Sequence, residues 1–243
     1  MIAEALEWCL TPCPWFARRR GILAAQIAIR HRAKRCRSSW KSHLEACRQF
    51  VACALQKSER QARLVILGSG HLNDFDLRFL RTRFDRIFLV DAVHPLDIQI
   101  HALVSKGHVG LLTADLSEPN KKIAEIVSSS DWVFSSCLLS QLGLFSASRD
   151  SRSILKQHLD LLTMARNAVF ITDVAKREPG ATEWVSLFEN AGFLGAEIEW
   201  IWNLAPPGEQ DSAGEERLVL GFQKNPPRLV FEMKSEERDA FVR

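Results

Sequence analysis

The stretch Arg63-Leu-Val-Ile-Leu-Gly-Ser-Gly-His-Leu72 decides the fold, together with Arg86-Ile-Phe-Leu-Val-Asp91. In the first stretch an apolar run ends in a Gly-x-Gly turn, and in the second an apolar run ends in an acid, 21 residues after Gly70. In α/β sheets such glycines let the backbone approach a ligand, and an acid that ends the second strand accepts hydrogen bonds from ribose hydroxyls. The two stretches therefore predict a site for a ligand that contains adenosine.

The rest of the chain after residue 62 alternates between short apolar strands and amphipathic helices. We expect strands at 63–68, 86–91, 109–114, 131–136 and 168–173, separated by helices at 74–83, 95–106, 119–128 and 151–166. After a further helix at 181–191, strands at 196–203 and 216–223 follow each other without a helix, so they should pair as an antiparallel hairpin. The pattern predicts an α/β fold: a doubly wound, Rossmann-like, mostly parallel sheet of seven strands that ends in a hairpin.

Composition is typical of one large domain with an extension. Hydrophobic residues make up 47% of the 243 residues, and no apolar run approaches the roughly 18 residues of a membrane-spanning helix. Glu4 and Glu7 stand where a secretion signal would carry basic residues, so we expect a cytoplasmic protein. The six cysteines lack the C-x2-C pairs of common zinc sites, so reduced thiols and no metal site are expected.

The charge is divided unevenly along the chain. Residues 1–60 hold 12 Lys and Arg against 4 Asp and Glu, whereas the remaining residues hold 20 against 25. We therefore expect a basic N-terminal helical extension at 1–57, a ligand-binding domain at 58–226 and a C-terminal tail at 227–243. From Trp15 to about Leu55 the extension should form two helices that break near Ser38-Ser39. One interpretation of its basic residues between 18 and 41 is a surface that binds nucleic acid, anionic lipid or protein. The interpretation that we favour is a solvated helix face that also pairs with the acidic core.

From about residue 60 to residue 225 these motifs resemble the class I S-adenosylmethionine-dependent methyltransferases. More narrowly, Leu89-Val-Asp-Ala-Val-His-Pro95 and Leu138-Leu-Ser-Gln-Leu142 look like a group of poorly characterised bacterial methyltransferase-like proteins. The resemblance implies that the chain binds S-adenosylmethionine and transfers its methyl group to an acceptor that the sequence does not identify. In this resemblance the methionine end of the cofactor would contact Gly68, Ser69 and Gly70, and the ribose would contact Asp91. The adenine would lie at Asp115 and Leu116, and Ser135 would also line the site.

The acceptor would meet the methyl group near Ser136 and Cys137, at the end of the fourth strand. His71 follows the first strand and Asp173 ends the fifth, so either could contact the substrate or act as a general base. Trp200, two residues before a second tryptophan on the same strand face, is expected to pack against a helix with it.

The chain departs from the family pattern at three places. Ile66 stands where an acid is usual, Leu72 replaces the third glycine, and the fourth strand lacks the Asn-Pro-Pro-Tyr type of motif that holds an exocyclic amine. Two alternatives therefore stay open. One is a non-catalytic binding or scaffold protein on a degenerate methyltransferase fold, which would act through its basic N-terminal helices. The other is a nicotinamide-dependent oxidoreductase, although Asn73 stands where that fingerprint needs glycine.

Overall fold

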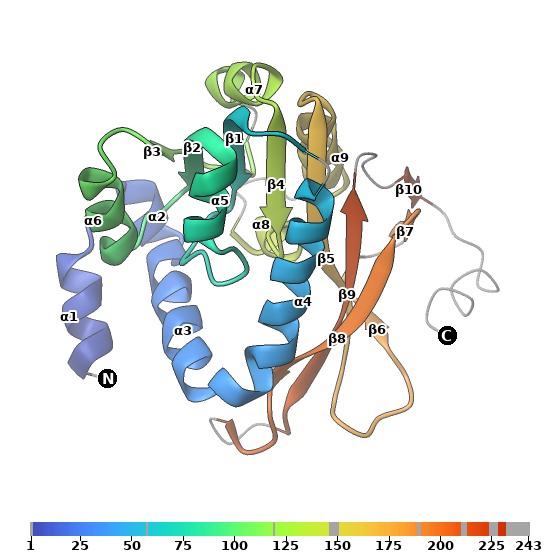
Figure 1. Cartoon of the computed structure of the whole chain (residues 1–243). Helices are drawn as coiled ribbons and strands as arrows, with labels where there is room; N and C mark the ends of the chain where they lie inside the picture. The colour runs from blue at the N-terminus through green and yellow to red at the C-terminus, as the bar shows by residue number, and fades with distance from the viewer. Residues whose placement is uncertain are drawn as a thin grey trace.

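A single mixed sheet organises the computed structural model, which describes residues 2–56, 58–118, 120–145, 151–188, 191–209, 213–223 and 228–231. Its strands lie in the order β3-β2-β1-β4-β5-β9-β8 (Figure 1). Their bounds are β1 Gln61–Leu67, β2 Phe84–Asp91, β3 Val109–Thr113, β4 Trp132–Ser136, β5 Asn167–Arg177, β8 Ile198–Ala205 and β9 Glu215–Gln223. The first five strands run parallel, and β9 pairs antiparallel with both β5 and β8. The predicted doubly wound sheet with its terminal hairpin is confirmed.

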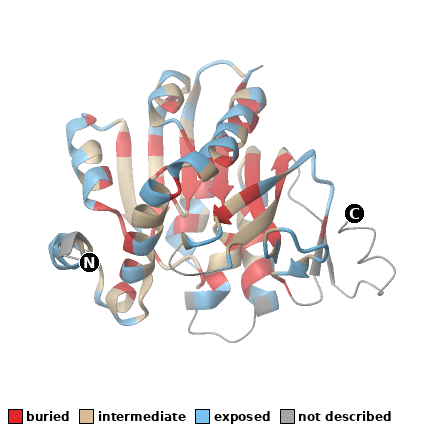
Figure 2. Ribbon diagram, turned by 90° about the horizontal axis from the view of Figure 1, so that it is seen from below, coloured by how far each residue is buried: buried red, intermediate tan, exposed pale blue. Residues whose placement is uncertain are grey.

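Helices cover both faces of this sheet. They are α5 (Leu77–Arg83), α6 (Leu96–Val104), α7 (Lys121–Ser128), α8 (Leu139–Phe145) and α9 (Ser151–Thr163). Successive residues of β1 point to opposite faces: Leu64 and Ile66 join the apolar cluster under α5, and Val65 and Leu67 join the cluster under α7 and α9. Burial on both faces explains why β1 is apolar at every position from Leu64 to Leu67. Figure 2 shows the buried residues concentrated in the strands, with exposed residues on the outer sides of the helices.

The N-terminal residues form four helices and pack against the sheet. They are α1 (Ile2–Leu10), α2 (Trp15–Arg19), α3 (Ile22–Arg35) and α4 (Arg37–Leu55). The expected break near Ser38-Ser39 lies instead at Cys36, which is buried and separates α3 from α4. In Figure 1, α3 lies beyond the end of the sheet toward which β4 points, and α4 packs along β8. The extension therefore covers the carboxyl ends of the parallel strands, where open α/β sheets bind ligands.

The expected helix at 181–191 is wrong. Val185–Ser186 forms a two-residue strand, β6, against the end of β5, and Ala191–Leu194 forms β7. Phe188 and Phe193 are both buried, with ring centroids 5.1 Å apart. Burial of these rings stabilises an extended segment over its intrinsic helical preference. With β6 the sheet has eight strands among the described residues rather than the expected seven.

The C-terminal segment adds a second, small sheet. β10 (Arg228–Phe231) pairs antiparallel with β7, so this part of the tail forms a strand. Residues 224–227 and 232–243, which include most of the expected tail, lie outside the described residues. In the part of the chain that the structure describes, no helix is both long enough and apolar enough to cross a membrane.

Candidate functional site

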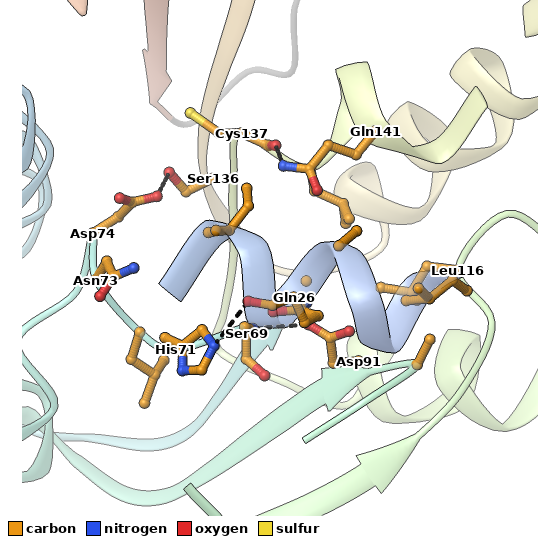
Figure 3. Close-up of a pocket in the computed structure, with 18 of the residues that line it drawn as sticks. Gln26, Ser69, His71, Asn73, Asp74, Asp91, Leu116, Ser136, Cys137 and Gln141 are labelled. Carbon is orange, nitrogen blue, oxygen red and sulfur yellow. Dashed lines mark hydrogen bonds between the residues drawn. The ribbon is translucent and has the colours of Figure 1, made fainter. Parts of the chain in front are cut away.

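A cavity lies at the carboxyl ends of β1 to β4, beneath α3, with about 1050 Å³ of space free of protein atoms, part of it open to solvent (Figure 3). The strand order reverses beside β1, whose neighbours are β2 and β4. Such a reversal is where open α/β sheets place their ligands. The predicted residues that the structure brings together around this cavity are Gly68, Ser69, Gly70, His71, Asp91, Asp115, Leu116, Ser136 and Cys137.

The turn after β1 depends on its glycines. Gly68 and Gly70 have φ angles of 66° and 45°, in the left-handed region that glycine adopts at little cost. A Cβ atom on Gly68 would lie 2.7 Å from the side chain of Leu138, so the turn also needs a residue without a side chain there. Leu72, at the position of the missing third glycine, keeps a φ of 55° and is buried. The backbone of the turn is therefore left-handed at this position although the residue there is not glycine.

Asp91 ends β2 and points at this turn. One carboxylate oxygen accepts a hydrogen bond of 2.8 Å from the backbone N–H of Gly70, and the other accepts one of 3.3 Å from Val93. Burial raises the pKa of Asp91 to about 6, although these backbone N–H groups favour the charged form. A carboxylate oxygen can accept more than one hydrogen bond, so both oxygens of Asp91 retain capacity toward the cavity.

Asp115 follows β3 and is already engaged by the protein. One of its oxygens pairs with the guanidinium of Arg20, and the other accepts hydrogen bonds from the Ser117 backbone N–H at 3.0 Å and hydroxyl at 2.6 Å. Its neighbour Leu116 also lines the cavity. The third strand thus contributes an apolar side chain and a carboxylate that holds the N-terminal extension against the site.

Helix α3 closes one side of the cavity. Ile22, Ala25, Gln26 and Ile29 line it from this helix, and the backbone carbonyl of Gln26 lies 3.3 Å from His71 Nε2 (Figure 3). Burial lowers the pKa of His71, so the imidazole is neutral near pH 7. His71 therefore contacts the covering helix, an arrangement that the sequence did not predict.

The opposite end of the cavity contains polar groups that the sequence analysis missed. Asp74 lines the cavity and accepts a hydrogen bond of 2.6 Å from the Ser136 hydroxyl (Figure 3). Its position shortly after the glycine turn was the signal that could have revealed it. Cys137 has a φ of 47°. Left-handed backbone angles are unusual for residues other than glycine and occur often at functional sites. Burial raises the pKa of the Cys137 thiol well above its usual range, so it is a poor nucleophile.

Two predicted residues lie outside the cavity lining. Ser135 is completely buried, and its hydroxyl lies 3.0 Å from Nε2 of His158 on α9. Asp173 accepts a hydrogen bond of 2.7 Å from Ser140 and pairs at 2.8 Å with Arg217 of the hairpin. Side chains on a strand alternate between the faces of a sheet, so Ser135 points to the helix layer and its neighbour points to the cavity.

Many basic side chains of the extension pair with acids. Arg20 pairs with the carboxylate after β3, Arg30 contacts Glu7 at 2.6 Å, and Arg35 contacts Glu209 at 2.6 Å. Two of the three pairs join the extension to acids of the following domain, and the pair of Arg30 with Glu7 lies within the extension. They reduce the positive field that would attract a nucleic acid.

Comparisons with known proteins concern the fold. No protein-family model matches the chain, and no curated protein matches it in sequence. Among solved structures, one similar chain is the 1,6-didemethyltoxoflavin-N1-methyltransferase of Burkholderia thailandensis, crystallised with S-adenosylhomocysteine. It is 16% identical, with 82% of this chain and 88% of that chain covered and a TM-score of 0.45.

Two further structures show the same level of likeness. A putative RNA methyltransferase from Pyrococcus horikoshii is 14% identical, with 78% of this chain and 85% of that chain covered and a TM-score of 0.45. A putative tRNA methyltransferase from Streptococcus pneumoniae, in complex with S-adenosyl-L-methionine, is 12% identical, with 78% and 76% covered and a TM-score of 0.39. The strand order and the antiparallel terminal hairpin, described above, give this chain a class I methyltransferase-like fold.

Proposed function

We propose that the protein transfers a methyl group from S-adenosylmethionine to an acceptor. The observation that carries the proposal is the placement of Asp91. This buried carboxylate ends the second strand, points at the Gly68–Gly70 turn and lines a cavity at the reversal of strand order. A carboxylate in this place suits the two adjacent hydroxyls of a ribose, and the backbone of the turn suits the methionine end of the cofactor.

The residues of the cavity fit this cofactor. The hydroxyl of Ser69 is buried and has no hydrogen-bond partner within the described part of the chain, so it is available to a polar group of a ligand. Leu116 supplies an apolar surface beside Asp115, as an adenine ring would require. Ile66 replaces the usual acid but is completely buried among apolar residues, where it stabilises the strand instead of contacting the cavity.

The cofactor, when bound, would supply a methyl group activated by a positively charged sulfur. The task left to the chain is to bind, to align acceptor and methyl group, and to exclude water. Helix α3 serves the exclusion of water, because Ile22, Ala25 and Ile29 place apolar groups over the cavity. Alignment by proximity needs no dedicated nucleophile, which agrees with the neutral, buried thiol of Cys137.

Calorimetric titration of the purified protein with S-adenosylmethionine, S-adenosylhomocysteine and NADH tests this proposal. We expect micromolar binding of the two adenosyl sulfur compounds and none of NADH. Binding of NADH alone would favour the oxidoreductase alternative. Absence of all three would leave the methyl-transfer proposal without support.

One observation favours a second candidate, a non-catalytic protein on the same fold. Both oxygens of Asp115 are engaged by Arg20 and Ser117, as they would be in a protein whose extension has settled permanently over the site. In that case, contacts with a nucleic acid or a protein would involve residues 18–41. Salt-sensitive binding of nucleic acid without cofactor binding supports this candidate.

A further inference from the structure

A chain of hydrogen-bonding side chains surrounds Asp74 at the end of the cavity away from Asp91. The indole N–H of Trp200, on β8, donates to Nδ1 of His43, on α4, at 3.0 Å. Nε2 of His43 lies 3.6 Å from one oxygen of Asp74, and the hydroxyl of Ser136 donates to the other oxygen at 2.6 Å. Three separate parts of the fold thus converge on one carboxylate.

The direction of this chain follows from its first donor. An indole N–H can only donate, so Nδ1 of His43 must accept, and a ring proton lies on Nε2, facing Asp74. The ring of His43 is completely buried and stacks on Trp202 with the centroids 4.1 Å apart and the planes 8° apart. Stacking and the indole bond fix the orientation of the imidazole, as second partners do for functional histidines.

The same residues resemble a metal site, but their chemistry opposes one. Ligand atoms of His43, Cys47 and Asp74 lie within 4.8 Å of one another. A metal would need the Nε2 lone pair of His43, which the proton occupies in this tautomer. The arrangement instead holds a carboxylate at a fixed place.

That place is the end of the cavity where an acceptor would enter. A cofactor held by Asp115, Asp91 and the glycine turn would extend along the ends of β3, β2 and β1. Asp74 lies beyond this turn, next to Ser136 on β4, as Figure 3 shows. The methyl group would therefore lie between the two halves of the cavity, on the side of Asp74.

The surroundings of Asp74 select for one type of ligand. The side chain of Asp74 is 20% exposed. Burial alone would raise its pKa, but its interactions with His43, Ser136 and Arg48 outweigh burial and lower it. The carboxylate is therefore ionised. Trp40 and Trp202 line the same cavity with apolar rings. The indole N–H of Trp202 is buried and has no hydrogen-bond partner among the described residues.

We propose that Asp74 recognises the methyl acceptor and that the acceptor is an uncharged amine on an apolar framework. This inference rests on the proposed methyl transfer. A fixed carboxylate accepts a hydrogen bond from an N–H group and repels carboxylates, phosphates and thiolates. In the reaction the nitrogen lone pair forms the N–CH3 bond while the S–CH3 bond breaks and leaves its electron pair on sulfur. Positive charge thus moves to the nitrogen beside Asp74, and the N–H proton then leaves to water.

Three small probes test this assignment on the protein loaded with S-adenosylhomocysteine: aniline, N,N-dimethylaniline and benzoate. All carry an aromatic ring, but aniline alone has an N–H group and benzoate alone is negatively charged. By ligand-detected NMR titration we expect aniline to bind at least tenfold more tightly than either of the others. Equal affinities, tighter binding of benzoate, or no binding of aniline would overturn the proposal.

Two variants attribute the selectivity to the carboxylate. Asp74→Asn keeps the shape, and we expect it to weaken aniline binding tenfold and to lower kcat/KM for aniline methylation at least a hundredfold. Asp76→Asn is the matched control, because Asp76 is an exposed helix cap and asparagine caps equally well. Its values should match those of the unaltered protein. An unchanged kcat/KM in Asp74→Asn refutes the assignment.

The role of Trp200 is one of positioning, and Trp200→Phe removes the indole N–H that fixes His43. We expect this variant to lower kcat for aniline several-fold with an unchanged affinity for the cofactor.

Binding of S-adenosylhomocysteine to the unaltered protein distinguishes failure of the proposed function from failure of the assignment of Asp74. If S-adenosylhomocysteine does not bind the unaltered protein, the proposed function fails. If it binds but the three probes are not distinguished, only the assignment of Asp74 fails. Should Asp74→Asn not fold, the probe comparison on the unaltered protein decides alone.

Discussion

Replacement of Asp91 by Asn separates a binding role of this carboxylate from a stabilising one. In the folded protein the pKa of Asp91 is raised to about 6, against an ordinary value of 3.8. Keeping the group ionised at pH 7 therefore costs about 3 kcal/mol of folding free energy, from about 1.4 kcal/mol for each pKa unit. Asparagine removes this cost because it carries no charge.

The substitution also has an unfavourable effect on folding. The carboxylate accepts hydrogen bonds from the backbone N–H groups of Gly70 and Val93, and the amide of Asn offers only one accepting oxygen. Loss of one such bond to a charged acceptor costs about 1.5–3 kcal/mol. The two effects nearly cancel, so we expect the free energy of unfolding of Asp91→Asn to change by less than about 2 kcal/mol.

Cofactor affinity should respond much more strongly. A ribose bound to Asp91 donates hydrogen bonds to a charged acceptor, and the neutral amide loses about 2–4 kcal/mol of this interaction. The dissociation constant for S-adenosylhomocysteine should therefore rise about 30-fold to several hundredfold. Calorimetry gives the affinity, and urea unfolding followed by tryptophan fluorescence gives the stability, both at pH 7.5.

Asp85→Asn is the control on the same strand. Asp85 is exposed and pairs with Arg60 on the surface, so its loss should change stability by less than about 1 kcal/mol and leave cofactor binding unchanged. An affinity of Asp91→Asn within twofold of the unaltered protein would refute the ribose contact. A loss of more than about 4 kcal/mol of stability would refute the reasoning about burial of the charge.

Three further predictions concern titration and the glycine turn. If the ribose needs the ionised form of Asp91, the affinity for S-adenosylhomocysteine should fall about tenfold between pH 7 and pH 5 and level off above pH 7. The reason is that the folded-state pKa of Asp91 is about 6. Calorimetry at several pH values measures this affinity. His158 is buried as the neutral ring with its pKa lowered from 6.5 to about 4, so its contribution to stability of about 3 kcal/mol is complete above pH 6.5 and lost as the pH falls toward 4. Asp91 acts in the opposite direction, because its stability contribution is lost as the pH rises from 3.8 through 6. Comparing the urea unfolding of the unaltered protein with that of His158→Gln at each pH therefore isolates the contribution of His158. Gly68→Ala should destabilise the protein by about 2–4 kcal/mol through backbone strain and contact with Leu138. Gly70→Ala should cost only about 1–2 kcal/mol, because an added Cβ there meets only Gln26 at 3.5 Å. Thermal unfolding measures both losses, and equal losses would contradict this geometry of the turn.

The sequence by itself determined the sheet and the cavity lining that the glycine turn and the strand ends supply. Apolar runs such as Leu64–Leu67 can be recognised locally, because a strand covered on both faces needs an apolar side chain at nearly every position. Parallel strands with right-handed crossovers bring their carboxyl ends to one edge, so Gly70 and Asp91 had to meet once the strands were correct. Local pattern and chain connectivity sufficed for these features.

Only the tertiary structure decided which polar side chains share an environment. Ser135 and Ser136 are adjacent in sequence, yet one faces a buried histidine and the other faces Asp74. Likewise, the contact of Trp200 with His43 joins residues that are 157 positions apart, and neither shows a motif. Such contacts depend on how α4 packs against β8, and hydrophobic burial sets that packing without regard to sequence distance. The expected helix at 181–191 was wrong for the same reason, since burial of aromatic rings outweighed its local preference.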